Sequence, residues 1–248
     1  MIKFGPVDAA RIAALLVPFL PPPALSDAQL AQLSAYLDLL LRWNARINLT
    51  AVHAPEEVVT RHFGESLFAA RCIFGALPTV RPSCLSQHSE KFPPTAPPLS
   101  GDLLCAFEVI DLGSGAGFPG LPIKIYAPEI HLTLIESQHK KATFLREVVR
   151  ALTLTGVNVF SGRAEDFQKS GGNAADLVTL RAVEKFTAVL PAATAMLKEK
   201  PAGRIALLIG ARQVEGAENL LPCLRWDVPA PVPHSAARVV LIGTNQPR

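Results

Sequence analysis

Hydrophobic residues recur with a helical spacing in the first part of the chain. Residues 8–20 predict a short amphipathic helix that ends at a run of prolines, and Ser26 can cap a second helix that runs to about Trp43. The second helix has one apolar face, formed by Leu30, Leu33, Leu37, Leu40 and Leu41. Because no alternating strand pattern occurs here, we interpret residues 1–77 as an N-terminal helical cap.

Residues 78–102 have a different character. Prolines are interspersed with serine, threonine, glutamine and lysine, and neither a helical nor a strand period is present. This composition is typical of a mobile loop or a linker. We expect it to separate the helical cap from a sheet domain formed by residues 103–248.

Strands and helices alternate over the rest of the chain. The pattern predicts strands at 107–112, 131–136, 157–161, 175–180 and 204–209, with helices at 119–127, 139–153 and 184–198. A late pair of strands at 223–227 and 237–243 looks antiparallel. The alternation predicts an α/β fold with a Rossmann-like, doubly wound parallel sheet, whose ligands bind beyond the carboxyl ends of the strands.

The loop after the first of these strands carries the strongest chemical signal. Residues 113–117, Gly-Ser-Gly-Ala-Gly, have almost no side chains, and glycine permits both positive φ and the close approach of a ligand. A strand, a glycine loop and a helix start together indicate a nucleotide-binding corner. Because Gly115, Gly117 and Gly120 also fit G-x-G-x-x-G, a dinucleotide site and a plain turn remain alternatives.

Two features favour S-adenosylmethionine over a dinucleotide. Asp111 precedes the loop, where a carboxylate would repel a pyrophosphate but not a methionine ammonium group. Pro119 and Pro122 flank Gly120, and we expect them to prevent the close helix–strand packing of a dinucleotide site. Glu136 ends the next strand, about 20 residues later, where a carboxylate can grip a ribose diol. An exposed acid at a helix start is the alternative for Glu136.

Charged residues follow two further strands. Residues 163–165 come after the third strand, and Arg181 follows the strand that should lie beside the glycine-loop strand. We expect them to converge with Asp111 on one crevice, because parallel strands end at the same edge. Arg181 can position a cofactor or a phosphate with its planar fork of donors, and an ion pair with Asp111 or Glu184 is the alternative.

Composition and charge are compatible with this fold and this site, but they do not distinguish between the possible ligands. The 248 residues are 49% hydrophobic and 18% charged, which allows a sizeable core, and the net charge of +3 is compatible with a nucleic acid partner. The four cysteines have no C-x-x-C spacing, so we expect neither a zinc site nor a disulfide framework. No stretch is long and apolar enough for a membrane span, and we expect a soluble, cytoplasmic protein.

Motifs along most of the chain resemble one family. They are Trp43-Asn44 with Asn48-Leu49-Thr50, Arg61-His62, the Asp111–Gly120 loop, Glu136-Ser137 with Lys141, Phe144-Leu145-Arg146, Gly162-Arg163-Ala164-Glu165 and Arg181-Ala182. Together they resemble the RsmG (GidB) family of 16S ribosomal RNA guanine-N7 methyltransferases. The resemblance implies a class I S-adenosylmethionine-dependent methyltransferase fold with an N-terminal helical extension. It also implies S-adenosyl-L-methionine as the methyl donor and the guanine at position 527 of 16S rRNA as the acceptor.

The family pattern also implies roles for individual residues. It implies that Gly113 and Phe118 line the methionine end, that residues 136–138 surround the ribose and that Ala164 and Glu165 flank the adenine. Arg181 also borders the cofactor. The predicted cofactor-binding residues are Asp111, Gly113, Gly115, Gly117, Phe118, Glu136, Ser137, Gln138, Ala164, Glu165 and Arg181, and Arg181 is also the predicted catalytic residue. The sequence departs from the family in its long segment 78–102 and in Ile209, where a lysine is common. Residues from about 211 onward match least.

Guanine N7 is a neutral lone pair with no proton to lose, so methyl transfer to it needs positioning and electrostatics rather than a general base. No histidine has a serine or cysteine partner at a recognisable spacing, which argues against a hydrolase triad. The predicted RNA-binding residues are Arg46, Arg61, His62, Lys140, Lys141, Arg146 and Arg163, and a solvated helix face is the alternative for the 140–150 helix. Trp43 can stack on a base, but we favour a core position.

Three functions remain to be compared. The first is the RNA methyltransferase, which would act on 16S rRNA in the small subunit or an assembly intermediate, as a monomer without a metal. The second is an NAD-dependent oxidoreductase built on the glycine pattern. The third is a non-catalytic RNA-binding module that keeps the fold.

Overall fold

The structure, a computed structural model, describes residues 7–22, 25–75, 107–172, 174–181 and 186–246. The predicted linker at 78–102, residue Ala182 and residue Glu184 lie outside this part of the chain.

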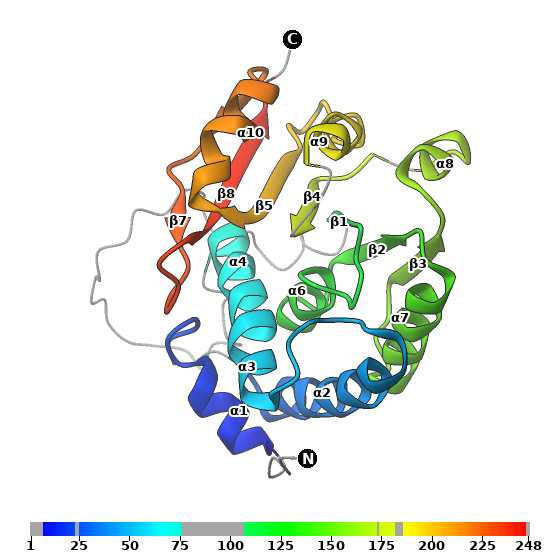
Figure 1. The fold of residues 1–248 in the computed structure, drawn as a ribbon. Coiled ribbons are helices and arrows are strands. Elements are labelled where there is room, and N and C mark those ends of the chain that lie inside the picture. Colours follow the sequence, from blue (N-terminus) through cyan, green and yellow to red (C-terminus); the bar gives the residue numbers. More distant parts are fainter. Residues whose placement is uncertain (1–6, 23–24, 76–106, 173, 182–185, 247–248) are drawn as a thin grey trace, which may run out of the picture.

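Helices form the N-terminal part (Figure 1): α1 Ala9–Leu16, α2 Asp27–Ile47, α3 Pro55–Val58, the π-helical segment η1 Val59–Gly64 and α4 Glu65–Phe74. Local sequence sets the ends of α2. Ser26 and Gln29 form a capping box at its start, and Asn48 adopts the left-handed conformation at its end, with φ 49°. The carbonyl oxygen of the Asn44 side chain accepts from the N–H of Thr50 at 2.9 Å and closes this turn. The helix therefore continues beyond its predicted end at Trp43.

The sheet has the strand order β3-β2-β1-β4-β5-β8-β6, and β7 pairs with β8. Its strands are β1 Glu108–Leu112, β2 His131–Glu136, β3 Val157–Ser161, β4 Leu177–Arg181, β5 Arg204–Gly210, β6 Leu224–Trp226, β7 Ala230–Pro231 and β8 Arg238–Asn245. The first five are parallel, whereas β8 runs antiparallel to both β5 and β6. The predicted α/β class and the late antiparallel pair are confirmed. The chain places β8 between β5 and β6, which the sequence pattern did not indicate.

Helices cover both faces of the sheet (Figure 1). The first face carries α2, α4, α6 Gly120–Tyr126 and α7 His139–Ala151, and the second carries α8 Ala164–Lys169, α9 Phe186–Thr194 and α10 Val214–Leu220, which follows the 3-10 turn η2 Ala211–Gln213. Val109 of β1 belongs to the first core, while its neighbour Ile110 belongs to the second, because successive strand residues point to opposite faces. The first core also includes Tyr36 and Phe63, so the N-terminal helices share one core with the sheet.

One expectation about the glycine loop is wrong. A Cβ added to Gly120 would lie 2.8 Å from both Cβ of Asp111 and Cδ2 of Leu134, so α6 packs closely on β1 and β2. Pro119 and Pro122 do not prevent this contact, because they lie at the start of the helix, where a missing N–H costs no helical hydrogen bond.

The predicted helix 184–198 is also too long. Helix α9 ends at Thr194, because the chain then turns so that Leu197 forms a β-bridge with Ala175. The short helices α8 and α10 were not predicted, since six or seven residues are too few to show a helical period.

Candidate functional site

The glycine loop connects β1 to α6 and crosses the end of β2. The N–H groups of Gly113 and Ser114 donate to the carbonyl oxygen of Ile135 at 2.9 and 3.0 Å. Gly113, Gly115 and Gly117 have φ values of 72°, 56° and 93°, a region that glycine adopts without strain. A Cβ added to Gly113 would meet no heavy atom within 4 Å. The outer side of the loop therefore leaves room for a ligand against the backbone.

Asp111 lies beneath this loop with 1% of its surface exposed. Its Oδ1 accepts from the hydroxyl of Thr179 on β4 at 2.7 Å, whereas its Oδ2 is buried without a partner among the described residues. Burial raises the pKa of Asp111 to about 6, although Thr179, Ser114 and the backbone N–H of Gly120 favour the ionised form. A buried carboxylate oxygen that lacks a donor suits a bound ammonium group or a water molecule.

Glu136 holds the loop to the end of β2. Its Oε2 accepts from the N–H of Gly115 at 2.8 Å, and its Oε1 accepts from the N–H of Gln138 at 2.7 Å. Only 6% of Glu136 is exposed, while Ser137 and Gln138 beside it are exposed. Each carboxylate oxygen has a second lone pair, so the same group can both fix the loop and accept from a ligand hydroxyl.

Aromatic side chains support the loop from the first face of the sheet. The ring of Phe118, 7% exposed, stacks on His62 at a centroid distance of 4.7 Å and on Tyr36 at 5.5 Å, and it packs against Phe63. The hydroxyl of Tyr36 donates to the carbonyl oxygen of Ala116. Since Tyr36 and His62 come from α2 and η1, the N-terminal helices shape the glycine loop directly.

Arg181 ends β4, which lies beside the glycine-loop strand as predicted. Its Nη2 donates to Oε2 of Glu65 at 2.9 Å and to the carbonyl oxygen of Arg61 at 2.6 Å. The guanidinium carbon lies 5.9 Å from the ring centroid of Phe118. The acid paired with Arg181 is thus Glu65 and not Asp111, because α4 packs across β5 and β8 and brings its first residue to the strand ends.

The predicted adenine-side residues lie at the next strand end. Ala164 begins α8 directly after β3 and is partly exposed, and Glu165 and Arg163 are exposed. The ends of β1, β2, β3 and β4 therefore bring the predicted cofactor residues to one edge of the sheet.

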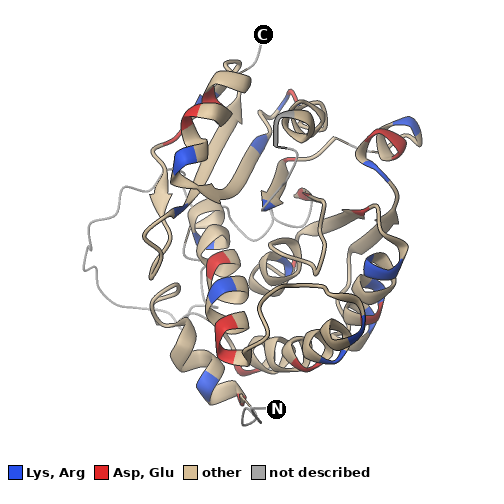
Figure 2. Cartoon of the chain, viewed as in Figure 1, with Lys and Arg blue, Asp and Glu red and all other residues tan. Residues whose placement is uncertain are grey.

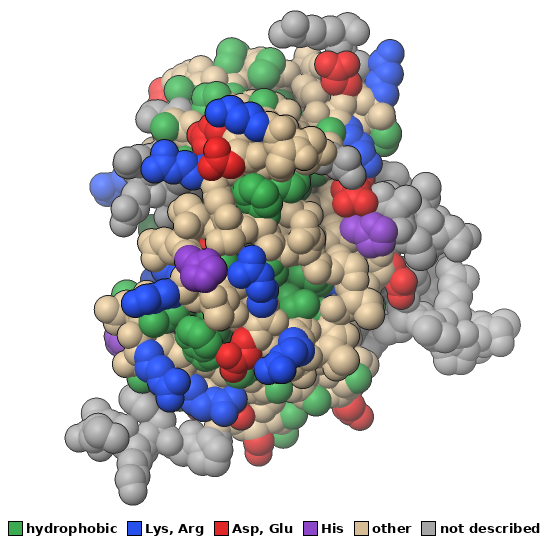
Figure 3. All heavy atoms as spheres, turned by 90° about the vertical axis from the view of Figure 1, so that its right-hand side faces the viewer, with side chains coloured by type: hydrophobic (Ala, Val, Ile, Leu, Met, Phe, Trp, Pro, Cys, Tyr) green, Lys and Arg blue, Asp and Glu red, His purple; other side chains and the backbone are tan. Residues whose placement is uncertain are grey.

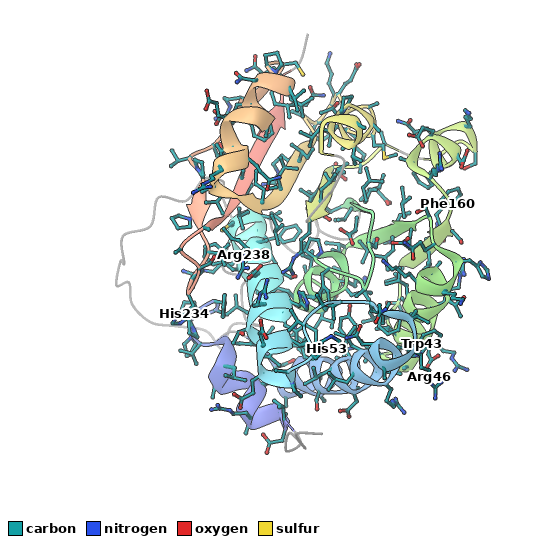
Figure 4. The ribbon with its side chains drawn as sticks, in the orientation of Figure 1. Trp43, Arg46, His53, Phe160, His234 and Arg238 are labelled. Atoms are coloured by element: carbon teal, nitrogen blue, oxygen red, sulfur yellow. The ribbon has the colours of Figure 1, made fainter. Side chains whose placement is uncertain are left out.

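Most of the predicted RNA-binding residues lie on another part of the surface. Arg46, Lys140 and Arg146 are exposed on α2 and α7, and Lys141 is partly exposed. Trp43 packs on Phe144 at a centroid distance of 5.7 Å, so the end of α2 lies against α7. Figure 4 shows Trp43 and Arg46 at this end of α2, with Trp43 partly buried against the core, as we favoured. In Figure 3, Lys and Arg side chains gather over the lower half of the surface that faces the viewer. Figure 2 shows several of the Lys and Arg positions, in blue, on α7.

Arg61 and His62 lie apart from this basic face, beside Arg181. Nε2 of His62 lies 2.7 Å from Oγ1 of Thr50, and burial, followed by the charges of nearby arginines, lowers the pKa of His62 to about 3. His62 is therefore neutral at physiological pH and supports the ring of Phe118.

Among the described residues, a groove and a cavity lie away from the glycine loop. A groove of about 430 Å³ runs between α7 and the edge strand β3 and is lined in part by Arg146 and Arg150. A cavity of about 290 Å³ lies on the second face, against Phe160 and Phe167. Neither hollow is lined by a residue of the glycine loop.

Sequence reasoning missed four residues around the site: Tyr36, Glu65, Thr179 and Arg238. Glu65 had one local signal, an acid in the largely apolar run from Phe63 to Ala70. Arg238 had none, because its relation to Arg181 arises only from the strand order.

In the part of the chain that the structure describes, no three histidine, cysteine or acidic side chains are grouped as metal ligands would be. None of the described helices has the length and apolar character that crossing a membrane requires.

Comparison with known proteins bears on the glycine loop and the surrounding sheet. The chain is 38% identical over 165 residues to the ribosomal RNA small subunit methyltransferase G of Exiguobacterium sp., covering 66% of this chain and 58% of that protein. It is 36% identical over 206 residues to the protein of the same name from Streptococcus agalactiae, covering 81% and 74%. The alignment thus spans less than two thirds of the first relative's length.

The crystal structure of TrmN from Thermus thermophilus has a similar fold, with a TM-score of 0.51 and 16% identity, covering 76% of this chain and 53% of that one. The family model GidB, described as rRNA small subunit methyltransferase G, matches residues 29–78 and 102–220. That match contains the glycine loop, Glu65, Glu136 and Arg181, so this chain belongs to the GidB family of rRNA small subunit methyltransferases.

Proposed function

We propose that the protein transfers a methyl group from S-adenosyl-L-methionine to N7 of guanine 527 in 16S rRNA. The observation that carries the proposal is an open glycine loop between two buried carboxylates, Asp111 and Glu136, at the strand ends of a chain in the GidB family. Membership in that family argues against an NAD-dependent oxidoreductase.

The residues around the loop suit the methyl donor. Gly113 offers backbone without a side chain, and the unpaired Oδ2 of Asp111 offers an acceptor for an ammonium group or its water. The carboxylate of Glu136 has lone pairs for ribose hydroxyls beside the exposed Ser137 and Gln138. When bound, S-adenosyl-L-methionine supplies an electrophilic methyl group on a sulfonium centre.

The chemistry asks little more of the protein than placement. Guanine N7 attacks with its own lone pair, in line with the bond that breaks, and no proton has to leave first. His62 is neutral and buried under Phe118, so it is not positioned as a base. The protein's contribution is to orient the two reactants and to hold fixed charges around a positive charge that moves onto the base.

Arg181 is our candidate for the positioning of a reactant. It stays protonated at neutral pH although burial lowers its pKa to about 10. Its Nη1 is buried without a partner among the described residues, so the guanidinium has a donor left for a ligand. Because Arg181 lies over Phe118, that donor is close to the glycine loop.

The exposed basic residues of α2 and α7, Arg46, Lys140 and Arg146, can hold the RNA backbone through phosphate contacts. The partner in this proposal is 16S rRNA in the small subunit or in an assembly intermediate, in the cytoplasm, with the protein acting as a monomer.

The test is to map N7-methylguanine in 16S rRNA of small subunits that lack the modification, after incubation with the protein and S-adenosyl-L-methionine. We expect one new site, at position 527, and none without the donor. Equilibrium binding of NAD and of S-adenosyl-L-methionine serves as the control for the oxidoreductase alternative. RNA binding without methyl incorporation would identify a non-catalytic module instead.

A further inference from the structure

A buried glutamate holds two arginines from different strands at the edge of the site. Glu65, with a side chain 3% exposed, contacts Nη2 of Arg181 through Oε2 at 2.9 Å and Nη2 of Arg238 through Oε1 at 2.5 Å. Arg181 ends β4 and Arg238 begins β8, while Glu65 is the first residue of α4. Figure 4 shows Arg238 beside α4.

The strand order explains how residues so distant in sequence meet. β8 runs antiparallel to β5, with Arg238 opposite Gly210, and Arg181 of β4 is opposite Leu208 of β5. The first residue of β8 therefore lies at the edge where the parallel strands end, and Glu65 links it to Arg181 of β4, the strand beside the glycine-loop strand. Arg238 is also outside the residues that the family model matches.

The two arginines of this cluster share one paired carboxylate. The single carboxylate of Glu65 faces both Arg181 and Arg238, and His62 adds no charge because its pKa is about 3. Arg61 is paired through Nη1 with Glu57 at the surface. Asp111 makes no ion pair with Arg181, although its charge also acts on that guanidinium. Among the described residues, Glu65 is therefore the only carboxylate in ion-pair contact with Arg181 or Arg238.

Donors in the cluster are also left over. Nη1 of Arg181 and Nε of Arg238 are buried and have no partner among the described residues. Buried polar groups are normally paired, and guanidinium groups with free N–H donors match the oxygens of carboxylates and phosphates. Two guanidinium groups that share one paired carboxylate and keep unpaired donors suit an oxyanion.

We propose that Arg238, together with Arg181 and positioned by Glu65, forms an oxyanion site that takes a phosphate of the substrate RNA. This rests on the proposed function, which brings two oxyanions to this edge: the phosphodiester of the RNA and the carboxylate of the methyl donor. Exposure separates them. The side chain of Arg238 is 33% exposed against 12% for Arg181, so Arg238 faces the side from which a polymer approaches.

The experiment compares Arg238→Gln with a matched control, Arg204→Gln. Arg204 is also a sheet arginine that contacts α4, through the carbonyl oxygen of Ile73 at 3.0 Å, but it lies at the opposite edge of the sheet. Affinity is measured over a range of salt concentrations for a mixed-sequence single-stranded RNA, and by calorimetry for S-adenosyl-L-methionine, with melting curves for each variant.

Arg238→Gln should weaken RNA binding about tenfold and reduce the log–log salt slope by about one, since one phosphate contact is lost. Its affinity for S-adenosyl-L-methionine should equal that of the wild type, and Arg204→Gln should change neither affinity. Arg238→Lys, which keeps the charge, should keep the salt slope and bind RNA more weakly than the wild type.

Wild-type RNA affinity and salt slope in both Arg238 variants would overturn the proposal. A loss confined to S-adenosyl-L-methionine binding would overturn it as well and assign the site to the donor's carboxylate. Binding of mixed-sequence RNA does not require methyl transfer. The binding result therefore tests the oxyanion site even if the protein does not methylate guanine 527.

Discussion

An arginine binds the η1–α4 helical segment at each of two edges of the sheet, the edge where the parallel strands begin and the edge where they end. Among the described residues, buried arginine nitrogens without a partner occur only at the second of these edges. At the edge where the parallel strands begin, Arg204 donates to the carbonyl oxygen of Ile73 near the end of α4, and its guanidinium carbon lies 5.9 Å from the ring centroid of Phe107. At the edge where they end, Arg181 repeats this arrangement with the carbonyl oxygen of Arg61 and the ring of Phe118.

The difference lies in the remaining donors. Arg204 has no buried unpaired nitrogen, whereas Arg61, His62, Arg181 and Arg238 each have one when only the described residues are considered. Leaving such groups unpaired costs stability, so a fold that served stability alone would pair them. The comparison indicates that Arg204 fixes the helix in place, and it supports the proposal that the Arg181 edge takes a ligand.

The sharpest way to break this comparison is to remove the shared counterion. Glu65→Gln keeps the shape of the side chain but leaves two buried guanidinium groups without a carboxylate. We expect the free energy of unfolding to fall by about 3 kcal/mol, because breaking a buried ion pair strands the remaining charge. Arg204→Gln, which loses a hydrogen bond to the carbonyl oxygen of Ile73, should cost about 1–2 kcal/mol. Urea unfolding of both variants measures this, and equal losses would remove the distinction between the two edges.

The buried carboxylate of Asp111, under the glycine loop, predicts that stability depends on pH. The pKa of Asp111 is about 6 when folded, above its ordinary value of 3.8, so folding favours the protonated acid. This contribution to stability is fully present below about pH 4 and is lost as the pH rises through 6, in total about 3 kcal/mol.

Asp111→Asn should remove this contribution, so the stability of the wild type relative to the variant should fall by about 3 kcal/mol between pH 4 and pH 7.5. The lowered pKa of His62 acts in the opposite direction, but it is common to both proteins and cancels in this comparison. If the two proteins kept the same difference in stability at every pH, the carboxylate would not titrate in this range.

Catalytic loss should also be confined to one edge. Arg181→Ala should lower single-turnover methylation of small subunits by about 10²-fold, the loss expected for a positioning group. Arg181→Lys should recover part of the rate, since it keeps the charge without the planar fork. Arg204→Ala is the control that should melt earlier but react at the wild-type rate once folded. An unchanged rate in folded Arg181→Ala would show that Arg181 does not position a reactant. A large loss of melting temperature without a loss of rate would leave Arg181 only a structural role, as the ion-pair partner of Glu65.

The smallest effect concerns the carboxylate that both fixes the loop and faces the predicted ribose position. In Glu136→Gln, an amide NH₂ would face the N–H of either Gly115 or Gln138, and a charge-assisted acceptor would be lost. We expect binding of S-adenosyl-L-methionine to weaken about tenfold to a hundredfold, as hydrogen bonds to a charged group contribute about 1.5–3 kcal/mol. Calorimetry measures the affinity, and a wild-type value would remove Glu136 from the cofactor site.

Much of this architecture could be predicted from local patterns. The apolar runs around Val109, Leu132 and Val178 gave the parallel strands, and the Gly113–Gly117 loop gave the strand-to-helix corner. These features depend on residues within a few positions of one another, where hydrophobic period and glycine content act directly. Short helices such as α8 and α10 fell below the length at which that signal can be seen.

What the sequence by itself determined is the nature of the site: a glycine loop, acids at strand ends and an arginine after β4, each encoded by its immediate neighbours. What only the tertiary structure decided is which groups meet there. Arg181 lies 116 residues from Glu65, and Arg238 reaches the same carboxylate because β8 turns back between β5 and β6. No local period encodes such a meeting. Strand order and helix packing are settled by the burial of apolar surface over the whole chain, and the charges are then carried to wherever the core places them.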